Sequence, residues 1–297
     1  MAAPIRIMLV AGEPSGDALG ASLMAALKRQ IKSPIEFHGV GGPMMADAGL
    51  ESLFPMSELS VMGVAEVLPK IPKIMGLLRD TTEFTQRIKP DIVITIDSPG
   101  FNFRLAKRLR PLSRSLGFKM VHLVAPSVWV YRPGRAKKIA PLFDHLLALL
   151  PFEPPYFEKE GLACTFIGHP VVEARVPLDA GAKFRSDHNI NQKDKVLCVL
   201  PGSRHSETSR LLPVFGEAVR KLAAKNANLK IVVPTVSTVI ESVADAIKNW
   251  PGNPILVEGA ENRFAAFAAS DTAVAASGTV ALELSLVGVP MVIAYRL

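Results

Sequence analysis

Short apolar runs of strand type alternate with helix-like segments along the whole of this 297-residue chain. Repetition of strand, helix and strand predicts parallel sheets with helices on both faces. Polar residues together with Pro177, Asp179 and Gly181 interrupt this alternation between residues 172 and 195. We therefore expect an α/β fold of two doubly wound, Rossmann-like domains, one over residues 1–172 and one over residues 173–297. The expected strands are Ile5–Val10, Ile35–Val40, Ile92–Ile96, Met120–Val124, His145–Leu149, Cys164–Ile167, Val196–Leu200, Lys230–Val233, Ile255–Val257, Thr272–Ala275 and Met291–Ala294, and the clearest helical stretches, none of which contains a proline, are Asp17–Gln30, Ile74–Lys89 and Val214–Lys225.

Composition narrows the class of protein. Hydrophobic residues make up 49% of the chain and charged residues 21%, which predicts a sizeable core. The net charge of +7 favours an anionic partner, such as nucleic acid, an acidic membrane or a phosphorylated substrate. No segment has the roughly 18 uncharged apolar residues of a spanning helix, and Ile5–Val10 is too short for a signal peptide. Cys164 and Cys198 stand apart, which predicts a reducing compartment and no structural zinc site.

Two loops in the second half of the chain have the composition of a nucleotide-sugar site. The apolar run 196–200 stops at Pro201-Gly202, and Ser203 and Arg204 follow at once. Backbone N–H groups in such a turn can face a phosphate, and the guanidinium adds a planar, permanently charged fork. The second loop, Ser277-Gly278-Thr279, has Glu283 one turn into the next helix-like run, which offers N–H groups and an acceptor for ribose hydroxyls. Similar turns occur in α/β proteins for structural reasons alone, so both interpretations stay open for each loop.

Asp97 is the strongest candidate for a catalytic base, because it follows directly after the apolar run 92–96. A carboxylate at the mouth of a buried strand is partly desolvated, which raises its pKa and its basicity. This suits a group that takes a proton from an attacking hydroxyl. The structural alternative is an aspartate that caps the next helix. A metal-binding role is disfavoured because the chain contains no Asp-x-Asp pair.

The loop after the first expected strand, residues 12–17, reads Gly-Glu-Pro-Ser-Gly-Asp and lacks the spacing of a P-loop. Glu13 and Asp17 would repel a phosphate. One interpretation has Ser15 or Asp17 as the N-cap of a helix, and the other has this loop contacting the hydroxyls of a sugar acceptor. Ligands of doubly wound sheets bind beyond the carboxyl ends of the strands. We therefore expect ligand-facing loops, in a cleft between two such edges, at Gly12, Asp97, Ala125, Gly202 and Ser277.

An apolar stretch over residues 59–78 is broken by two prolines and carries two lysines, a pattern that a parallel-sheet core does not need. It is either ordinary buried helix and loop or an amphipathic patch that enters the headgroup region of a membrane. A second unusual segment places Trp129 and Tyr131 beside a basic run, residues 132–138, which suits either a solvated helix or a lipid phosphate. The candidate membrane-patch residues are Val61, Met62, Leu68, Ile71 and Ile74.

Eight short motifs, in this order along the whole chain, resemble those of the lipid-A-disaccharide synthases. They are Gly12-Glu13-Pro14-Ser15-Gly16-Asp17, Val61-Met62-Gly63, Asp97-Ser98-Pro99 with Phe101-Asn102, Pro126-Ser127-Val128-Trp129, Leu150-Pro151-Phe152-Glu153, Phe166-Ile167-Gly168-His169-Pro170, Leu200-Pro201-Gly202-Ser203-Arg204 and Ala276-Ser277-Gly278-Thr279. The resemblance implies a GT-B glycosyltransferase fold and an inverting transfer that uses no metal and no cofactor. The donor would be UDP-2,3-diacylglucosamine and the acceptor 2,3-diacylglucosamine 1-phosphate, whose 6-hydroxyl receives the sugar. The products would be a β-1,6-linked disaccharide phosphate and UDP, made at the cytoplasmic face of the inner membrane of Gram-negative bacteria.

The resemblance also implies roles for individual residues. Asp97 would deprotonate the acceptor hydroxyl, Arg204 would hold the diphosphate and Glu283 would bind the ribose. The other implied UDP-site residues are Gly202, Ser203, Ser277, Gly278 and Thr279, and the candidate acceptor or loop residues are Glu13, Ser15, Asn102 and Trp129. Members of this family continue past Leu297, and a homodimer that exchanges C-terminal elements is expected where that segment is present.

Two other functions stay open at this point. The first is another UDP-sugar GT-B enzyme, such as a UDP-N-acetylglucosamine epimerase or the muramyl-pathway transferase. An epimerase would not need the apolar stretch 59–78. The second is a non-catalytic binder of acidic lipid or nucleic acid, which rests on net charge alone. Scattered Lys and Arg with few aromatic residues do not make a nucleic-acid surface, so we expect no nucleic-acid partner.

Overall fold

The computed structural model describes residues 3–59, 71–129, 132–173 and 175–295. Contacts between residues divide the chain into unit 1, Met1–Pro170, and unit 2, Val171–Leu297. Each unit is built from strands and helices that alternate along the sequence.

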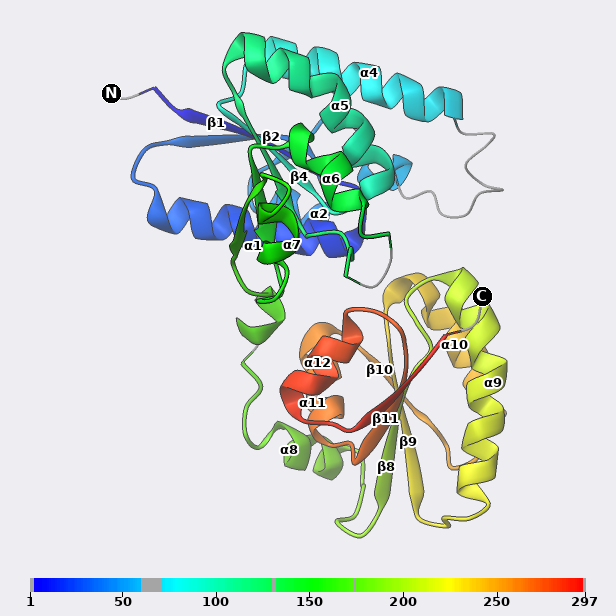
Figure 1. The fold of residues 1–297 in the computed structure, drawn as a ribbon. Coiled ribbons are helices and arrows are strands. Elements are labelled where there is room, and N and C mark those ends of the chain that lie inside the picture. Colours follow the sequence, from blue (N-terminus) through cyan, green and yellow to red (C-terminus); the bar gives the residue numbers. More distant parts are fainter. Residues whose placement is uncertain (1–2, 60–70, 130–131, 174, 296–297) are drawn as a thin grey trace. The chain divides into compact units, whose positions relative to one another are not determined.

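The described part of unit 1 forms a seven-stranded sheet with the order β3-β2-β1-β4-β5-β6-β7, in which every strand pair is parallel. Figure 1 shows α1 on one face of this sheet and α4 and α5 on the other. The strands are β1 (Ile5–Ala11), β2 (Ile35–Val40), β3 (Glu51–Ser52), β4 (Ile92–Ile96), β5 (Lys119–Leu123), β6 (His145–Ala148) and β7 (Ala163–Phe166). The helices are α1 (Pro14–Gln30), α2 (Pro43–Asp47), α4 (Ile71–Ile88), α5 (Pro99–Leu116), α6 (Arg135–Ile139) and α7 (Pro154–Glu158), with the 3₁₀ turns η1 (Met56–Glu58), η3 (Ala140–Leu142) and, at the junction of the units, η4 (Pro170–Glu173).

The described part of unit 2 forms a five-stranded parallel sheet with the order β10-β9-β8-β11-β12. Figure 1 shows α9 and α10 on one face of the sheet and α8, α11 and α12 on the other. The strands are β8 (Lys195–Leu200), β9 (Leu229–Thr235), β10 (Ile255–Glu258), β11 (Thr272–Ala276) and β12 (Met291–Ala294). The helices are α8 (Ala180–Asp187), α9 (His205–Ala223), α10 (Ile240–Ile247), α11 (Ala260–Ala268) and α12 (Val280–Val287), with the 3₁₀ turn η5 (Ser237–Val239).

Buried strands of parallel sheets are apolar on both faces, and the sequence follows this rule at the centre of each sheet. The last five residues of both β1 and β8 are buried. The predicted architecture of two parallel-sheet α/β domains is confirmed.

Each sheet has one point at which the strand order reverses. In unit 1 the chain runs outward from β1 to β3 and returns to place β4 on the other side of β1. In unit 2 it runs from β8 to β10 and returns to place β11 on the other side of β8. Ligands of doubly wound sheets bind in the crevice outside the carboxyl ends of the two strands at such a point. The fold therefore singles out the loops after β1 and β4 in unit 1 and after β8 and β11 in unit 2.

Two expectations about helices were wrong. The helix predicted from Val214 begins at His205 and continues through Pro213. Pro213 lies on the exposed side of α9, where water can satisfy the carbonyl group that loses its N–H partner. Ser15 and Asp17 do not cap α1, because this helix begins at Pro14 with Glu13 at the N-cap position.

Candidate functional site

The strand order places the expected crevice of unit 1 at the loops after β1 and β4. Asp97 and Ser98, which follow β4, both adopt left-handed backbone conformations, with φ of 46° and 44°. Two consecutive non-glycine residues in this region are uncommon, and such strain persists only where the surrounding structure enforces it. The strain therefore falls on the predicted base and on its neighbour.

Asn102, one turn into α5, holds the two strand ends of this crevice together. Its side-chain Nδ2 donates to the carbonyl oxygens of Val10 at 3.3 Å, Ile96 at 3.0 Å and Asp97 at 2.9 Å. The residue is 1% exposed, so its amide serves the loop backbone rather than the surface. The adjoining loop approaches closely, because a Cβ at Gly12 would lie 2.6 Å from the Oγ of Ser98. Glycine at this position lets the two loops meet.

In the loop after β1, Glu13 is half-buried and Ser15 is exposed at the start of α1. Asp17 is buried and accepts hydrogen bonds from the backbone N–H groups of Gly42, Met44 and Met45 at 2.9 to 3.0 Å. It therefore supports the N-terminus of α2, 25 or more residues away in sequence. This carboxylate has a structural role that sequence spacing could not reveal.

Trp129 lies in the loop after β5 and packs against residues that follow β6. The centroid of its ring lies 5.1 Å from that of Phe152, in an edge-to-face arrangement, and 6.4 Å from that of Tyr156. The loop that carries Phe152 is fixed by buried Glu153, whose Oε2 accepts the N–H groups of Leu149 and Leu150 at 3.0 and 2.9 Å. Phe152 itself is 48% exposed. An aromatic surface thus stands on a rigid support at the carboxyl edge of the sheet.

In the expected crevice of unit 2, the two predicted donor loops follow neighbouring strands, since Leu200 of β8 pairs with Ala275 of β11. Gly202 has a φ of +108°, and the exposed residues Ser203 and Arg204 lead into α9. Ser277, Gly278 and Thr279 are exposed and lead into α12. Both helices thus begin at the loops that were predicted to form the nucleotide-sugar site, where their N–H groups favour an anion.

Glu207, which the sequence reasoning missed, organises the first of these loops. Its Oε2 accepts the backbone N–H of Ser203 at 3.2 Å, and its Oε1 accepts Nη1 of Arg204 at 2.8 Å. A Cβ at Gly202 would lie 2.6 Å from the same carboxylate, so the glycine and Glu207 depend on one another. The sequence pattern that could have identified Glu207 is an acidic residue in the first turn of a helix, three residues after the N-cap.

Glu283 also has a partner that the sequence reasoning missed. Nη2 of Arg263, on α11, donates to Oε1 of Glu283 at 2.9 Å. Burial raises the pKa of the Glu283 carboxyl group, and the charge of Arg263 acts in the opposite direction. The pair joins α11 to the first turn of α12 and fixes the direction of the predicted ribose-binding carboxylate.

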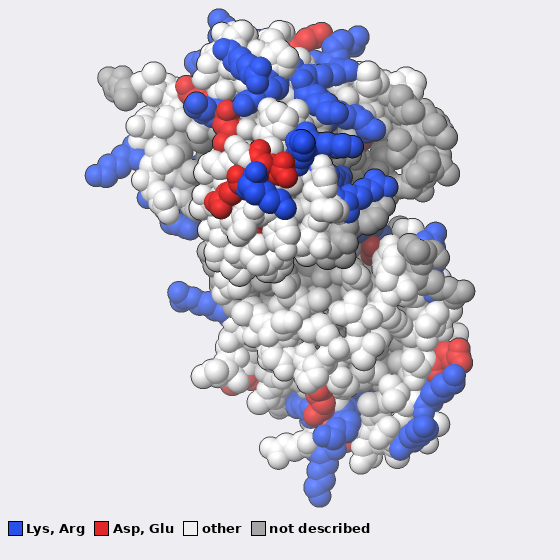
Figure 2. Space-filling view, viewed as in Figure 1, with Lys and Arg blue, Asp and Glu red and all other residues white. Residues whose placement is uncertain are grey.

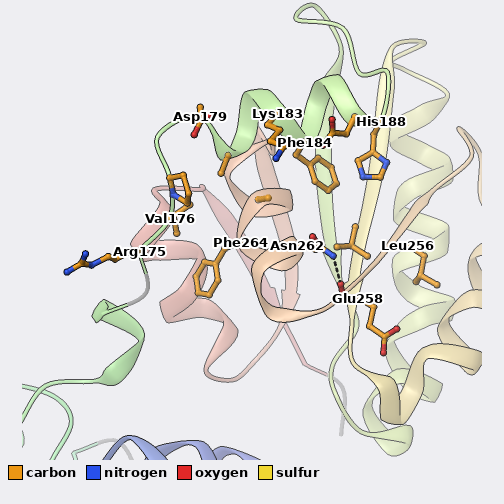
Figure 3. A pocket seen from close by; sticks show the side chains of 15 residues that line it. Arg175, Val176, Asp179, Lys183, Phe184, His188, Leu256, Glu258, Asn262 and Phe264 are labelled. Atoms are coloured by element: carbon orange, nitrogen blue, oxygen red, sulfur yellow. Dashed lines mark hydrogen bonds between the residues drawn. The ribbon is translucent and has the colours of Figure 1, made fainter. Parts of the chain in front are cut away.

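A separate pocket of about 810 Å³ lies in unit 2 between α8, β10 and α11. Figure 3 shows Phe184 of α8 and His188, which directly follows α8, pointing into it, with the hydrogen bond from Asn262 to the Glu258 carbonyl oxygen at 3.0 Å drawn as a dashed line. None of the predicted site residues lines this pocket. It lies along β10 at the edge of the sheet, away from the crevice between β8 and β11.

Most of the predicted membrane patch falls outside the described residues. This applies to Val61, Met62 and Leu68, and the side chain of Ile71 is likewise not described. Ile74 is partly buried against the core of unit 1. Among the described residues, no helix is long and apolar enough to cross a membrane, and no group of three or more His, Cys, Asp and Glu side chains could hold a metal ion.

A family model described as lipid-A-disaccharide synthetase matches residues 7–297. The chain belongs to this family. The lipid-A-disaccharide synthase of Rhodospirillum centenum is 53% identical over 294 residues, which cover 99% of this chain and 73% of that protein. The synthase of Paramagnetospirillum magneticum is 50% identical over 290 residues, which cover 98% and 74% of the two chains. The resemblance seen in the motifs is confirmed, and with it an enzyme family of lipid A biosynthesis.

Solved structures with the same fold include a UDP-GlcNAc 2-epimerase and MurG. The UDP-GlcNAc 2-epimerase of Neisseria meningitidis, bound to UDP-GlcNAc, has a TM-score of 0.65 and 14% identity, and the match covers 98% of this chain and 82% of that one. MurG of Acinetobacter baumannii has a TM-score of 0.59 and 14% identity, with 99% and 79% covered. At such low identity the likeness shows the fold alone, which is of the expected GT-B type. Membership of the lipid-A-disaccharide synthetase family separates this chain from both alternative enzymes.

Proposed function

We propose that this chain transfers 2,3-diacylglucosamine from UDP-2,3-diacylglucosamine to the 6-hydroxyl of 2,3-diacylglucosamine 1-phosphate and releases UDP. The observation that carries the proposal is the family match over residues 7–297. The position of the candidate loops supports it, because they follow the strands that flank the reversal point of each sheet.

In this reaction Asp97 is the general base. Its carboxylate accepts the proton of the acceptor hydroxyl while that oxygen forms a bond to the anomeric carbon of the donor. The bond from this carbon to the diphosphate breaks, and its electron pair leaves with UDP. Attack from the side opposite the diphosphate inverts the configuration of the sugar. The strained backbone at Asp97 and Ser98 supports this role, because such strain is concentrated at functional sites.

Arg204 and the N-terminus of α9 stabilise the charge that develops on the leaving UDP. The Arg204 side chain is 44% exposed and already oriented by Glu207, so a diphosphate can reach its guanidinium. Backbone N–H groups of Gly202, Ser203, Ser277, Gly278 and Thr279 add donors at two helix starts. Glu283, oriented by Arg263 through Oε1, binds the ribose hydroxyls through its other carboxylate oxygen.

Membrane association is part of the proposal because both substrates carry acyl chains. Unit 1 has a basic surface formed by exposed Arg104, Lys107, Arg114, Lys137 and Lys138. Figure 2 shows Lys and Arg side chains gathered on unit 1 over the part where α4, α5 and α6 lie in Figure 1. A peripheral position on the cytoplasmic face of the inner membrane would set this surface against anionic lipid, with the apolar stretch 59–78 in the headgroup region. The homodimer implied by the family resemblance remains a prediction.

Vesicle binding tests the membrane part of the proposal. Replacing Val61, Met62 and Leu68 by Ser should reduce binding to vesicles that contain anionic lipid. Val214→Ser is the matched control, because Val214 is an apolar residue 42% exposed on α9 of unit 2. Equal binding by the triple variant, the control and the unmodified protein would contradict a membrane role for this stretch.

Product formation tests the catalytic proposal. The protein is incubated in detergent micelles with UDP-2,3-diacylglucosamine and 2,3-diacylglucosamine 1-phosphate, and the lipid products are identified by mass spectrometry. Disaccharide phosphate with an equal amount of UDP is the expected result. Folded protein that binds UDP but forms no disaccharide would contradict the proposal. Conversion of UDP-N-acetylglucosamine in a parallel incubation would indicate one of the alternative enzymes.

A further inference from the structure

The conformation of the Asp97 loop requires an explanation beyond the sequence of the loop itself. Neither Asp97 nor Ser98 is a glycine, yet both have positive φ angles. The loop must turn sharply here because β4 ends at Ile96 and α5 begins at Pro99. Strain of this kind is maintained by bonds from outside the turn.

Asn102 supplies such bonds from both its side chain and its backbone. Nδ2 donates to the carbonyl oxygen of Asp97 at 2.9 Å and to that of Ile96 at 3.0 Å, and the backbone N–H donates to the carbonyl oxygen of Ser98 at 3.0 Å. The N–H of Asp97 is held from the other side by the carbonyl oxygen of Leu123 at 2.9 Å. One residue thus contacts the main chain of the turn before, at and after the predicted base.

A third carbonyl oxygen near the Asn102 amide belongs to β1, the strand on the other side of the expected crevice. Nδ2 also lies 3.3 Å from the carbonyl oxygen of Val10 in β1. The Oδ1 of Asn102 is buried and has no hydrogen-bond partner among the described residues. Burial of a polar group without a partner costs free energy. The hydrogen bonds of the NH₂ group are therefore what accounts for an asparagine at this position.

We propose that Asn102 is a positioning residue that acts through Asp97: its amide fixes the strained turn and thereby aims the Asp97 carboxylate at the acceptor hydroxyl. This inference rests on the proposed role of Asp97 as the general base. It assigns Asn102 no contact with either substrate, because the residue is buried beneath the loop. A shift of a reacting group by about 1 Å can cost about 10²-fold in rate, so removing the amide should slow turnover strongly.

A double-mutant cycle tests this inference, with Asn102→Ala and Asp97→Asn made singly and together. Ser113→Ala is the matched control, because Ser113 is also buried on α5 and its Oγ donates to a helix carbonyl oxygen at 3.1 Å. Turnover, KM for the donor and UDP affinity are measured on samples shown to be folded by circular dichroism. Asn102→Ala should lower kcat by about 10²-fold and leave donor KM and UDP affinity within about twofold, while the control keeps normal kcat.

The decisive comparison is the effect of Asn102→Ala when Asp97 has already been replaced. If Asn102 acts through Asp97, the second change should alter the residual rate by less than about threefold, since effects within one functional unit are not additive. An equal loss in both backgrounds would overturn the inference and leave the role of Asp97 standing. Full turnover by Asp97→Asn alone would refute the base and the inference together.

Asn102→Asp keeps the test available if the alanine variant does not fold. Burial against carbonyl oxygens raises the pKa of a carboxyl group, and its neutral form retains one O–H donor for the turn. We expect this variant to have a kcat about tenfold below that of the unmodified protein, again with unchanged UDP affinity. Turnover by Asn102→Asp equal to that of the unmodified protein would contradict the need for a doubly donating amide.

Discussion

Replacement of Glu207 by Ala should both destabilise unit 2 and disorder the donor loop. The carboxylate receives a charge-assisted hydrogen bond from the Ser203 N–H at 3.2 Å, for which about 1.5 kcal/mol is typical. Its pair with Arg204 contributes about 0.5 kcal/mol, because the Arg204 side chain is 44% exposed and screened by water. An acidic group in the first turn of α9 adds about 0.5 kcal/mol through the helix dipole. Together these predict a loss of about 2 to 3 kcal/mol in the free energy of unfolding of unit 2.

Urea unfolding followed by circular dichroism, together with UDP titration calorimetry, measures both effects. Glu207→Gln should lose only about 1 kcal/mol, because its amide oxygen can still accept the Ser203 N–H. Glu217→Gln is the control on the same helix, where the exposed pair with Lys221 should matter little. UDP affinity should fall severalfold in Glu207→Ala and stay normal in the control. A change in unfolding free energy below about 0.5 kcal/mol with unchanged UDP affinity would refute the reasoning, since ordinary surface substitutions lie in that range.

Three further substitutions test separate parts of the structure. Asp97→Asn should lower turnover by about 10²- to 10⁴-fold while UDP affinity measured by calorimetry stays the same, and undiminished turnover would remove Asp97 as the base. Arg204→Ala should weaken UDP binding by about 10- to 100-fold, which corresponds to the loss of a charge-assisted hydrogen bond, and intact affinity would contradict its diphosphate role. Burial lowers the pKa of His122 from 6.5 to about 3, so the stability that depends on its neutral form is complete above pH 6.5 and is lost as the pH falls toward 3. The free energy of unfolding should fall by up to about 1.4 kcal/mol per pH unit in this range. His122→Asn should make this dependence weaker between pH 6 and pH 4, as measured by urea unfolding at each pH. An unchanged dependence would show that another group controls acid unfolding.

The sequence predicted the sheets well because buried parallel strands are continuous apolar runs. Ile35–Val40, Ile92–Ile96 and Met291–Ala294 have the predicted bounds, and the other predicted strands differ by one or two residues at one or both ends. The two-residue strand β3, Glu51–Ser52, carries no apolar run and was missed. The start of α9 was misplaced because Pro213 was taken as a boundary, although an exposed proline can lie inside a helix.

The candidate site was predictable as a set of loops but not as a set of bonds. Motifs located Asp97, Arg204 and Glu283 because loops at strand ends have distinctive residue types. Their partners could not be found in this way: Arg263 lies 20 residues from Glu283 along the chain, and Asp17 lies 25 residues from Gly42. The left-handed turn at Asp97 could not be predicted either. It is held by the side-chain amide of Asn102, which lies five residues further along the chain and also contacts β1. Local patterns thus indicate candidate residues for the chemistry, whereas tertiary packing decides what orients them.

The strand order of unit 1 has a consequence for synthesis of the chain on the ribosome. β1 lies between β2 and β4 in the sheet, and its last five residues are buried in the finished structure. β1 ends at Ala11 and β4 starts at Ile92, so 80 residues, 12–91, must be added before synthesis of its second neighbour begins. At about 5 to 20 residues per second this takes about 4 to 16 seconds. During this interval the edge of β1 that pairs with β4 in the finished sheet has unpaired backbone N–H and C=O groups, and such an edge can pair with a strand of another chain.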